Sequence, residues 1–222
     1  MSFLNFSLGS KKKSFKKSSC SSNMMMIDSK PLFLTHPYAT IMLVKGDFKT
    51  IIELPKYVDI NEWLAFNTFE FFNHLNLFYG SITDFCTPQS CPTMSAGPGI
   101  EYTWTDNMTN KKIKLSAPQY IDYMTSHIES MIEDERLFPT KSGREFPVDF
   151  DQIVKNIFKQ LFKLFAHIYH HHFDKIISLH EESHFNSLFA HFISFARQFD
   201  LLEKKDIQPL YELIELHTQC NH

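Results

Sequence analysis

The stretch that most restricts the fold is DQIVKNIFKQLFKLFAHIYHH, residues 151–171. Its large apolar side chains recur at three- and four-residue intervals, so they fall on one face of an α-helix. The members of this stripe are Ile153, Val154, Ile157, Phe158, Leu161, Phe162, Phe165 and Ile168. A face of this length is removed from water only when other elements pack against it. We therefore predict a helical bundle built around this segment.

A second helix is predicted in DINEWLAFNTFEFFNHLNLFYG, residues 59–80. Asp59 is the expected N-cap, and Glu62 three residues later completes a capping-box arrangement. Gly80 is the expected stop, since glycine commonly ends a helix. The large side chains near helical spacing in this segment are Trp63, Phe66, Phe71, Leu75 and Phe78.

The remaining pattern predicts a mainly α fold with one small β-hairpin. EYTWTDNMTNKKIKLSAP, residues 101–118, alternates around polar turn residues, as hairpins do. Pro118 is placed to start a helix that runs to about Asp134. Residues 137–150 are expected to form a loop, and two or three further helices to follow residue 171. Only 6 glycines are present, which argues against a β-barrel or a phosphate-binding loop.

The charge distribution divides the chain into a basic tail and an acidic body. Residues 1–22 hold five lysines and no acid, so the rest has 17 basic against 25 acidic residues, a net charge of −8. We expect a disordered Lys/Ser-rich tail over 1–30 and a helical domain over 31–218. An acidic body disfavours nucleic acid and suits a basic protein segment. With neither a secretory h-region nor a run of roughly 18 apolar residues, we expect a cytoplasmic protein without a membrane span.

The segment SLHEESHF, residues 178–185, contains the H-E-x-x-H pattern of zinc hydrolases. In such enzymes two histidines on one helix face hold zinc and the intervening glutamate activates water. His180, Glu181 and His184 are the candidates for these roles. The extended version of the motif also needs Gly and His at positions that are Ser187 and Ala190 here. The alternative interpretation is a polar helix face that matches by chance.

A second candidate metal site pairs Cys86 and Cys91 with histidines of the 167–172 stretch. Two thiolates and two imidazoles suit a tetrahedral zinc ion. On a regular helix His167 and His171 share a face better than His167 and His172, so the latter pair requires a helix that breaks or turns near its end. Spacing alone does not choose between them. The alternative is two unpaired thiols beside a hydrated helix end.

Several segments, taken in order, closely resemble the Mob kinase-activator proteins. They are INEWLAFNTFEFFNHLNLFYGSITDFCTPQSCPTMSAGP, APQYIDYM, LFPTKSG, AHIYHHHF and HFNSLFAHF, with a weaker echo in KKSFKK of the tail. The similarity covers about residues 50–216. It implies a mainly helical core around an antiparallel bundle.

The resemblance also implies a structural Zn²⁺ site. Its ligands would be Cys86, Cys91, His167 and His172. Four protein ligands leave no open position for a substrate, so the site would not be catalytic. His171 stands where members of the family usually have Gln and is not expected to bind the ion. The family usually has Gln at the position of His180, so the hydrolase motif arises from a single substitution.

The function that the resemblance implies is that of a non-enzymatic adaptor. Such proteins bind the N-terminal regulatory segment of NDR/LATS-type AGC kinases and co-activate them. Binding without activation is the alternative within the family. The corresponding face here would be formed by Asp59, Glu62, Trp63, Phe66, Glu70 and His191. Trp63 could instead belong to the core, and the acids could be an ordinary solvated face. Lys56 and Val58 replace acids of the family pattern, which weakens the negative field.

Two further features of the family carry over in part. A phosphothreonine-binding set, which would link the adaptor to a sterile-twenty-like upstream kinase or a phosphorylated scaffold, corresponds to Lys159 and Lys163. Both family arginines are absent, and lysine does not reproduce the bidentate contact of a guanidinium. Ser14 and Thr40 occupy places where phosphorylation favours kinase binding. The resemblance adds the nucleus and the spindle poles to the cytoplasm as expected locations.

Overall fold

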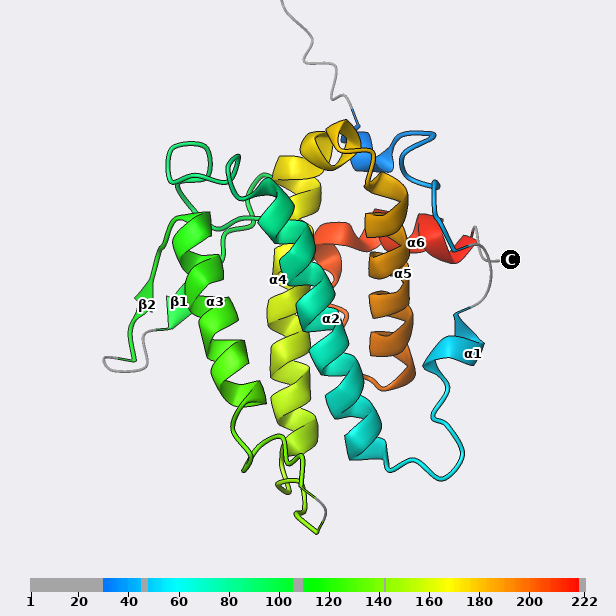
Figure 1. Ribbon diagram of the computed structural model, residues 1–222. Helices are drawn as coiled ribbons and strands as arrows, with labels where there is room; N and C mark the ends of the chain where they lie inside the picture. The colour runs from blue at the N-terminus through cyan, green and yellow to red at the C-terminus, as the bar shows by residue number, and fades with distance from the viewer. Residues whose placement is uncertain (1–29, 45–47, 106–109, 142, 220–222) are drawn as a thin grey trace, which may run out of the picture.

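The computed structural model describes residues 30–44, 48–105, 110–141 and 143–219. Four longer helices form the body of the molecule (Figure 1). They are α2 (Ile60–Ile82), α3 (Ala117–Ile132), α4 (Phe150–Ser178) and α5 (Glu182–Gln198). The shorter helical elements are η1 (Leu32–Leu34), α1 (Lys49–Ile52), η2 (Gln208–Leu210) and α6 (Tyr211–Gln219). The mainly α prediction is confirmed.

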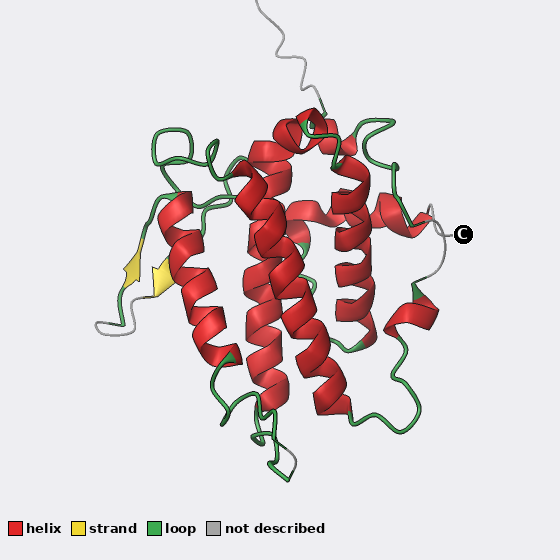
Figure 2. Cartoon of the chain, viewed as in Figure 1, coloured by secondary structure: helices red, strands yellow, loops and turns green. Residues whose placement is uncertain are grey.

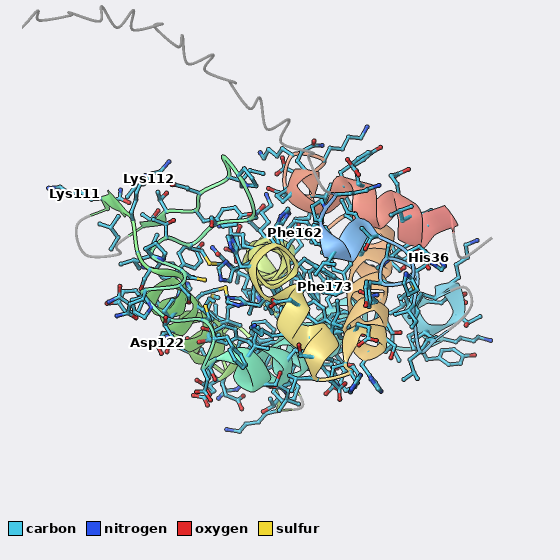
Figure 3. All side chains as sticks on the ribbon, turned by 90° about the horizontal axis from the view of Figure 1, so that it is seen from above. His36, Lys111, Lys112, Asp122, Phe162 and Phe173 are labelled. Carbon is cyan, nitrogen blue, oxygen red and sulfur yellow. The ribbon has the colours of Figure 1, made fainter. Side chains whose placement is uncertain are left out.

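Helix α4 is the centre of the packing. It contacts α2, α3, α5 and η1, and its apolar stripe is buried except for the half-buried Ile153. Figure 3 looks along α4, with Phe162 and Phe173 labelled near the middle of the molecule and Lys111, Lys112 and Asp122 on its outer edge. The burial follows from the sequence pattern, because the stripe points to neighbours on several sides.

Phenylalanine rings join α2, α4 and α5. The ring of Phe158 on α4 stacks on Phe192 of α5 with centroids 4.9 Å apart, and Phe71 of α2 meets it edge-on at 5.8 Å. Phe195 of α5 lies 5.9 Å from the same ring. Stacked and edge-to-face arrangements are those that aromatic quadrupoles favour. Helices α2, α4 and α5 therefore meet at one aromatic cluster.

The predicted hairpin is present but short. Strands β1 (Trp104–Thr105) and β2 (Lys112–Ile113) pair antiparallel, with Trp104 opposite Ile113. They lie at the edge of the bundle beside α3 (Figure 2). The ring of Trp104 packs edge-on against Tyr120 of α3 at 5.4 Å, which attaches the hairpin to the helices.

The ends of α2 agree with the sequence pattern at one terminus and differ at the other. Asp59 Oδ1 accepts hydrogen bonds from Asn61 N at 2.8 Å and Glu62 N at 3.3 Å, which confirms the N-cap. The helix continues past Gly80 to Ile82, so the predicted stop is wrong. Ile82 is fully buried, and its burial in the core outweighs the weak helix preference of glycine.

Residues 38–44 cross α5 and are held there by three side chains. Asn186 Nδ2 donates to the carbonyls of Tyr38 and Ile41, and Ser187 Oγ accepts from Leu43 N at 2.8 Å. His217 Nε2 of α6 donates to Ala39 O at 3.1 Å. This segment is thereby fixed to the last two helices, although more than 140 residues separate it from α5 in the chain.

The predicted tail, residues 1–30, lies outside the described residues apart from Lys30 and stays a prediction. Across the described ranges, each helix is too short or too polar to traverse a bilayer.

We predict that Phe158→Ala lowers the free energy of unfolding by about 3–5 kcal/mol, because it removes a buried ring from three aromatic contacts. Urea unfolding measures this change. Val148→Ala is the control, since Val148 is fully exposed and its truncation should change stability by less than about 0.5 kcal/mol. A loss below about 1 kcal/mol for Phe158→Ala would show that the cluster is not central to the fold.

His217 is predicted to make stability depend on pH. Burial lowers its pKa from 6.5 to about 4, so the unfolded chain takes up a proton first as the pH falls. Stability should therefore decrease by up to about 3 kcal/mol between pH 6.5 and 4 on account of this residue. In His217→Gln, which keeps an N–H donor for Ala39 O, this part of the pH dependence should disappear from urea unfolding curves. His127→Gln, an exposed site on α3, should leave the curve unchanged, and an equal slope in wild type and His217→Gln would contradict the assignment.

Candidate functional site

Four buried metal-ligating side chains converge between α4 and the loop that follows α2. Cys86 Sγ lies 3.5 Å from His167 Nε2, and Cys91 Sγ lies 3.4 Å from His172 Nε2. All four donor atoms lie within 4.8 Å of one another. Within the described residues this is the only group of three or more such side chains that could hold a metal ion.

The donor set fits a four-coordinate ion. With Zn–S near 2.3 Å and Zn–N near 2.0–2.1 Å, a regular tetrahedron separates sulfur from nitrogen by about 3.6 Å. The two sulfur–nitrogen distances in the structure are close to this value. The cluster can therefore hold a metal ion with little rearrangement, and four protein ligands would close its coordination shell.

A short network folds the loop so that both cysteines face α4. Cys86 N donates to Ile82 O at the end of α2, and Cys91 N donates to Thr87 O at 2.8 Å. Between the cysteines, Ser90 Oγ donates to Phe85 O at 2.7 Å and accepts from Thr87 N. These bonds form a tight turn between Cys86 and Cys91, and the turn directs both thiols toward α4.

His167 is oriented by a carbonyl that the sequence did not single out. Its Nδ1–H donates to Ser95 O at 2.9 Å, which leaves the lone pair of Nε2 facing Cys86. A hydrogen bond of this kind is the usual second-shell support of a metal-binding histidine. Nothing in the spacing of the sequence identifies Ser95, because 72 residues separate it from His167.

The expectation that His167 and His172 can meet only if the helix breaks or turns near its end holds in its second form. The backbone is helical from Phe150 to Ser178, but the last turns of α4, beside Phe173, run at an angle to the part that carries Phe162 (Figure 3). Both imidazoles point Nε2 at the cysteine loop. His171 is exposed and its Nε2 lies 2.9 Å from Ser95 Oγ, outside the cluster.

Burial sets the protonation of the cluster. It lowers the pKa of His167 to about 3 and that of His172 to about 4, so both imidazoles are neutral at pH 7 and free to bind an ion. It raises the pKa of the Cys86 thiol to about 12. A buried thiolate is therefore costly unless a cation balances its negative charge. A divalent metal ion would do so.

The hydrolase motif does not form a site of the required geometry. His180 lies in the turn between α4 and α5 with a φ of 60°, whereas His184 lies inside α5. The two histidines thus do not share one helix face. Glu181 Oε2 instead lies 3.0 Å from His184 Nδ1. The motif is therefore part of the turn between α4 and α5 and of the adjoining surface of α5, which holds His180, Glu181 and His184.

The predicted kinase-binding residues of α2 lie along its N-terminal half. Asp59 and Glu62 are exposed, Glu70 is half-buried, and the ring of Phe66 is 57% exposed. Trp63 is half-buried, and its indole Nε1–H donates to Ile52 O of α1 at 3.3 Å. Trp63 therefore supports this face by fixing α1 against α2, and its neighbours present charge and apolar surface to solvent.

His191 of α5 adjoins the same face. Its ring stacks on Phe48 at 5.6 Å and meets Phe71 of α2 at 4.9 Å. Among the described residues its Nε2 has no hydrogen-bond partner although it is buried. Burial, followed by the nearby His74, lowers the pKa of His191, so the ring is held neutral.

A hollow beside α4 contains both predicted phosphate-binding lysines. This lysine pocket has a volume of about 460 Å³. It is lined by Ile100, Tyr102, Asn156, Lys159, Gln160, Phe162, Lys163, Lys205, Asp206, Gln208 and Pro209. Lys205 and Asp206 were missed by sequence reasoning, because they lie more than 40 residues from Lys159 and Lys163 in the chain.

The two predicted phosphorylation positions differ in what the structure describes. Thr40 is half-buried in the segment across α5, and its Oγ1 donates to Pro37 O at 3.3 Å. Ser14 lies outside the described residues.

The model of the Mob1/phocein family matches residues 40–210. The chain is 52% identical over 189 residues to the CBK1 kinase activator protein MOB2 of Candida albicans, covering 85% of this chain and 60% of the relative. Its namesake in Saccharomyces cerevisiae is 51% identical, with 83% and 64% covered. The chain thus spans less than two thirds of these two fungal proteins.

A relative of more similar length is MOB kinase activator-like 1 homolog A of Dictyostelium discoideum. It is 53% identical over 179 residues, which cover 80% of this chain and 84% of the relative. The family match includes the cysteine loop, the histidines of α4 and most of the helical bundle. The chain belongs to the Mob1/phocein family.

Proposed function

We propose that this protein is a non-catalytic adaptor that binds the N-terminal regulatory segment of an NDR/LATS-type kinase and co-activates the kinase. The observation that carries the proposal is the exposed face at the start of α2, where the exposed acids Asp59 and Glu62 precede the exposed ring of Phe66. Acids beside apolar surface suit a basic amphipathic helix. The relatives whose names describe them as kinase activators support the same function.

The face at the start of α2 combines two kinds of surface. Its acids attract a positively charged segment and orient its approach. Exposed apolar side chains supply the area that a docked helix would cover: Ile60 is 47% exposed and Ile51 of α1 is 49% exposed. Because Trp63 ties α1 to α2, both kinds of surface are held in a fixed relation before a partner arrives.

We further propose that the Cys/His cluster holds Zn²⁺ in a structural role. The mixed thiolate and imidazole donors favour this ion, and the buried cluster leaves no position for a substrate. Bound there, zinc would link the loop after α2 to α4 and add to folding stability. The residues of the chain already provide the neutral imidazoles and the hydrogen bond from His167 to Ser95.

A second candidate function is recognition of a phosphothreonine segment from a sterile-twenty-like kinase or a phosphorylated scaffold. The lysine pocket supports it, since Lys159, Lys163 and Lys205 line one hollow. Ammonium groups bind phosphate as point charges, although without the bidentate geometry of arginine.

We predict that purified wild-type protein contains one zinc ion per chain and that Cys86→Ala contains none. The measurement is elemental analysis by mass spectrometry together with thermal unfolding. Removal of zinc with a chelator should lower the free energy of unfolding by at least about 4 kcal/mol, the contribution of a ligand present at a thousandfold excess over its dissociation constant. His184→Ala should retain the metal. Zinc that survives Cys86→Ala but is lost in His184→Ala would favour the hydrolase interpretation instead.

For the kinase, Glu62→Lys is expected to weaken binding of a recombinant NDR/LATS-type kinase by at least about tenfold, because it places a positive charge against a basic segment. Pulldown gives the affinity, and a phosphorylation assay with and without the adaptor separates activation from binding alone. Glu129→Lys makes the same charge change on α3, at the other edge of the bundle, and should bind normally (Figure 1). Equal binding by wild type and Glu62→Lys would exclude this face.

A further inference from the structure

The charges of the lysine pocket are compensated from within the protein. Lys159 Nζ lies 2.7 Å from Glu203 Oε1 and 3.5 Å from Asp206 Oδ2. Lys205 Nζ lies 2.7 Å from the other oxygen of the same glutamate, Oε2. Glu203 therefore bridges two of the three lysines that line or border the hollow, each through a separate carboxylate oxygen.

The third lysine is held differently. Lys163 Nζ donates to Tyr120 Oη and Gln160 Oε1, each at 3.2 Å, and lies 5.5 Å from the centre of the Tyr102 ring. Within the described residues no carboxylate lies at ion-pair distance from it. Its charge is largely removed from water, as shown by a pKa that burial lowers. Lys163 is thus the group of the pocket with most to gain from an added anion.

The two acids are presented by a rigid turn between α5 and α6. Glu203 N donates to Asp206 Oδ2 at 3.1 Å, and Asp206 N donates to Glu203 O at 2.9 Å. These reciprocal bonds fix the backbone of the turn over Lys159. The side chain of Glu203 remains about half exposed, so it can rotate away from the lysines without unfolding the turn.

We propose that Glu203 is an internal competitor for the anion that the lysine pocket binds. The inference rests on the proposed phosphothreonine recognition and names the residue that controls it. In the free protein the Glu203 carboxylate takes the place of a phosphate at Lys159 and Lys205. An incoming phosphate must displace it, and only a dianionic group brings enough charge to do so. A peptide carboxylate, with a single charge, is no better a partner than Glu203 itself, so the competitor also selects for phosphate.

The test is a titration of wild type and Glu203→Gln with inorganic phosphate, followed by the backbone amide signals of residues 156–163 in NMR spectra. Glu203→Gln removes the competing charge and keeps the size of the side chain. We expect it to lower the dissociation constant by about tenfold, because Lys159 and Lys205 become free and a like charge is removed. Glu215→Gln is the matched control: it removes the same charge from α6, where Glu215 lies 3.7 Å from Arg197 and outside the pocket.

A combined variant shows whether the effect passes through the two lysines that Glu203 contacts. If Glu203 competes for Lys159 and Lys205, the tightening should be mostly lost when Glu203→Gln is combined with both Lys159→Gln and Lys205→Gln. Tightening that persists in this combined variant, or that equals the effect of Glu215→Gln, would mean that only net charge matters and would overturn the proposal. Thermal unfolding of each variant verifies that the exposed substitutions leave the fold intact.

The same proteins titrated with a degenerate phosphothreonine peptide pool, and with the unphosphorylated pool, test the nature of the ligand. Glu203→Gln should bind the phosphorylated pool more tightly than wild type does, and should bind the unphosphorylated pool no more tightly. If wild type binds phosphate as tightly as Glu203→Gln does, the competitor role of Glu203 is wrong, whereas phosphate recognition by the pocket is still supported. Failure of every protein to bind phosphate would overturn both. Neither result bears on kinase binding at the start of α2, which the Glu62→Lys pulldown measures.

Discussion

The continuity of α4 is the constraint on which the other features depend. A single unbroken helix from Phe150 to Ser178 carries Phe158 into the aromatic cluster, His167 and His172 to the cysteine loop, and Lys159 to the lysine pocket. Because a helix fixes the direction of each side chain relative to the next, the packing of one face determines where the others point. Burial of the phenylalanine stripe therefore orients the metal cluster and the pocket as well.

The Cys/His cluster adds what aromatic packing cannot provide. The loop after α2 is rich in polar turn residues, and hydrogen bonds within it turn both buried cysteines toward α4. In a low-dielectric site, neutral imidazoles and protonated thiols attract each other weakly, whereas an ion held by two thiolates would attach the loop strongly. The structure thus places a set of donors suited to a divalent cation where the loop meets α4.

The long helices could be predicted from the sequence because their apolar periodicity is local. The same holds for Asp59 as the N-cap and for the small hairpin around Trp104. Local patterns failed where distant parts of the chain decide the outcome: burial of Ile82 carries α2 beyond Gly80, and spacing did not choose between His171 and His172 as the partner of His167. Ser95 and Glu203 could not have been found, since each acts on a residue 44 or more positions away. The H-E-x-x-H match, kept only as an alternative, forms no site because it spans the turn between α4 and α5.

The two candidate binding surfaces use charge in opposite ways. At the start of α2, Asp59 and Glu62 have no ion pair among the described residues, so their field is available to a partner from a distance. In the lysine pocket, Glu203 and Asp206 already neutralise Lys159, so little positive field extends into solvent. The pocket therefore distinguishes one anion from another only when the anion contacts it. The first arrangement favours rapid capture of a basic segment, and the second favours selectivity over affinity. An adaptor that binds one partner at all times, and a second partner only when that partner is phosphorylated, would need both kinds of surface.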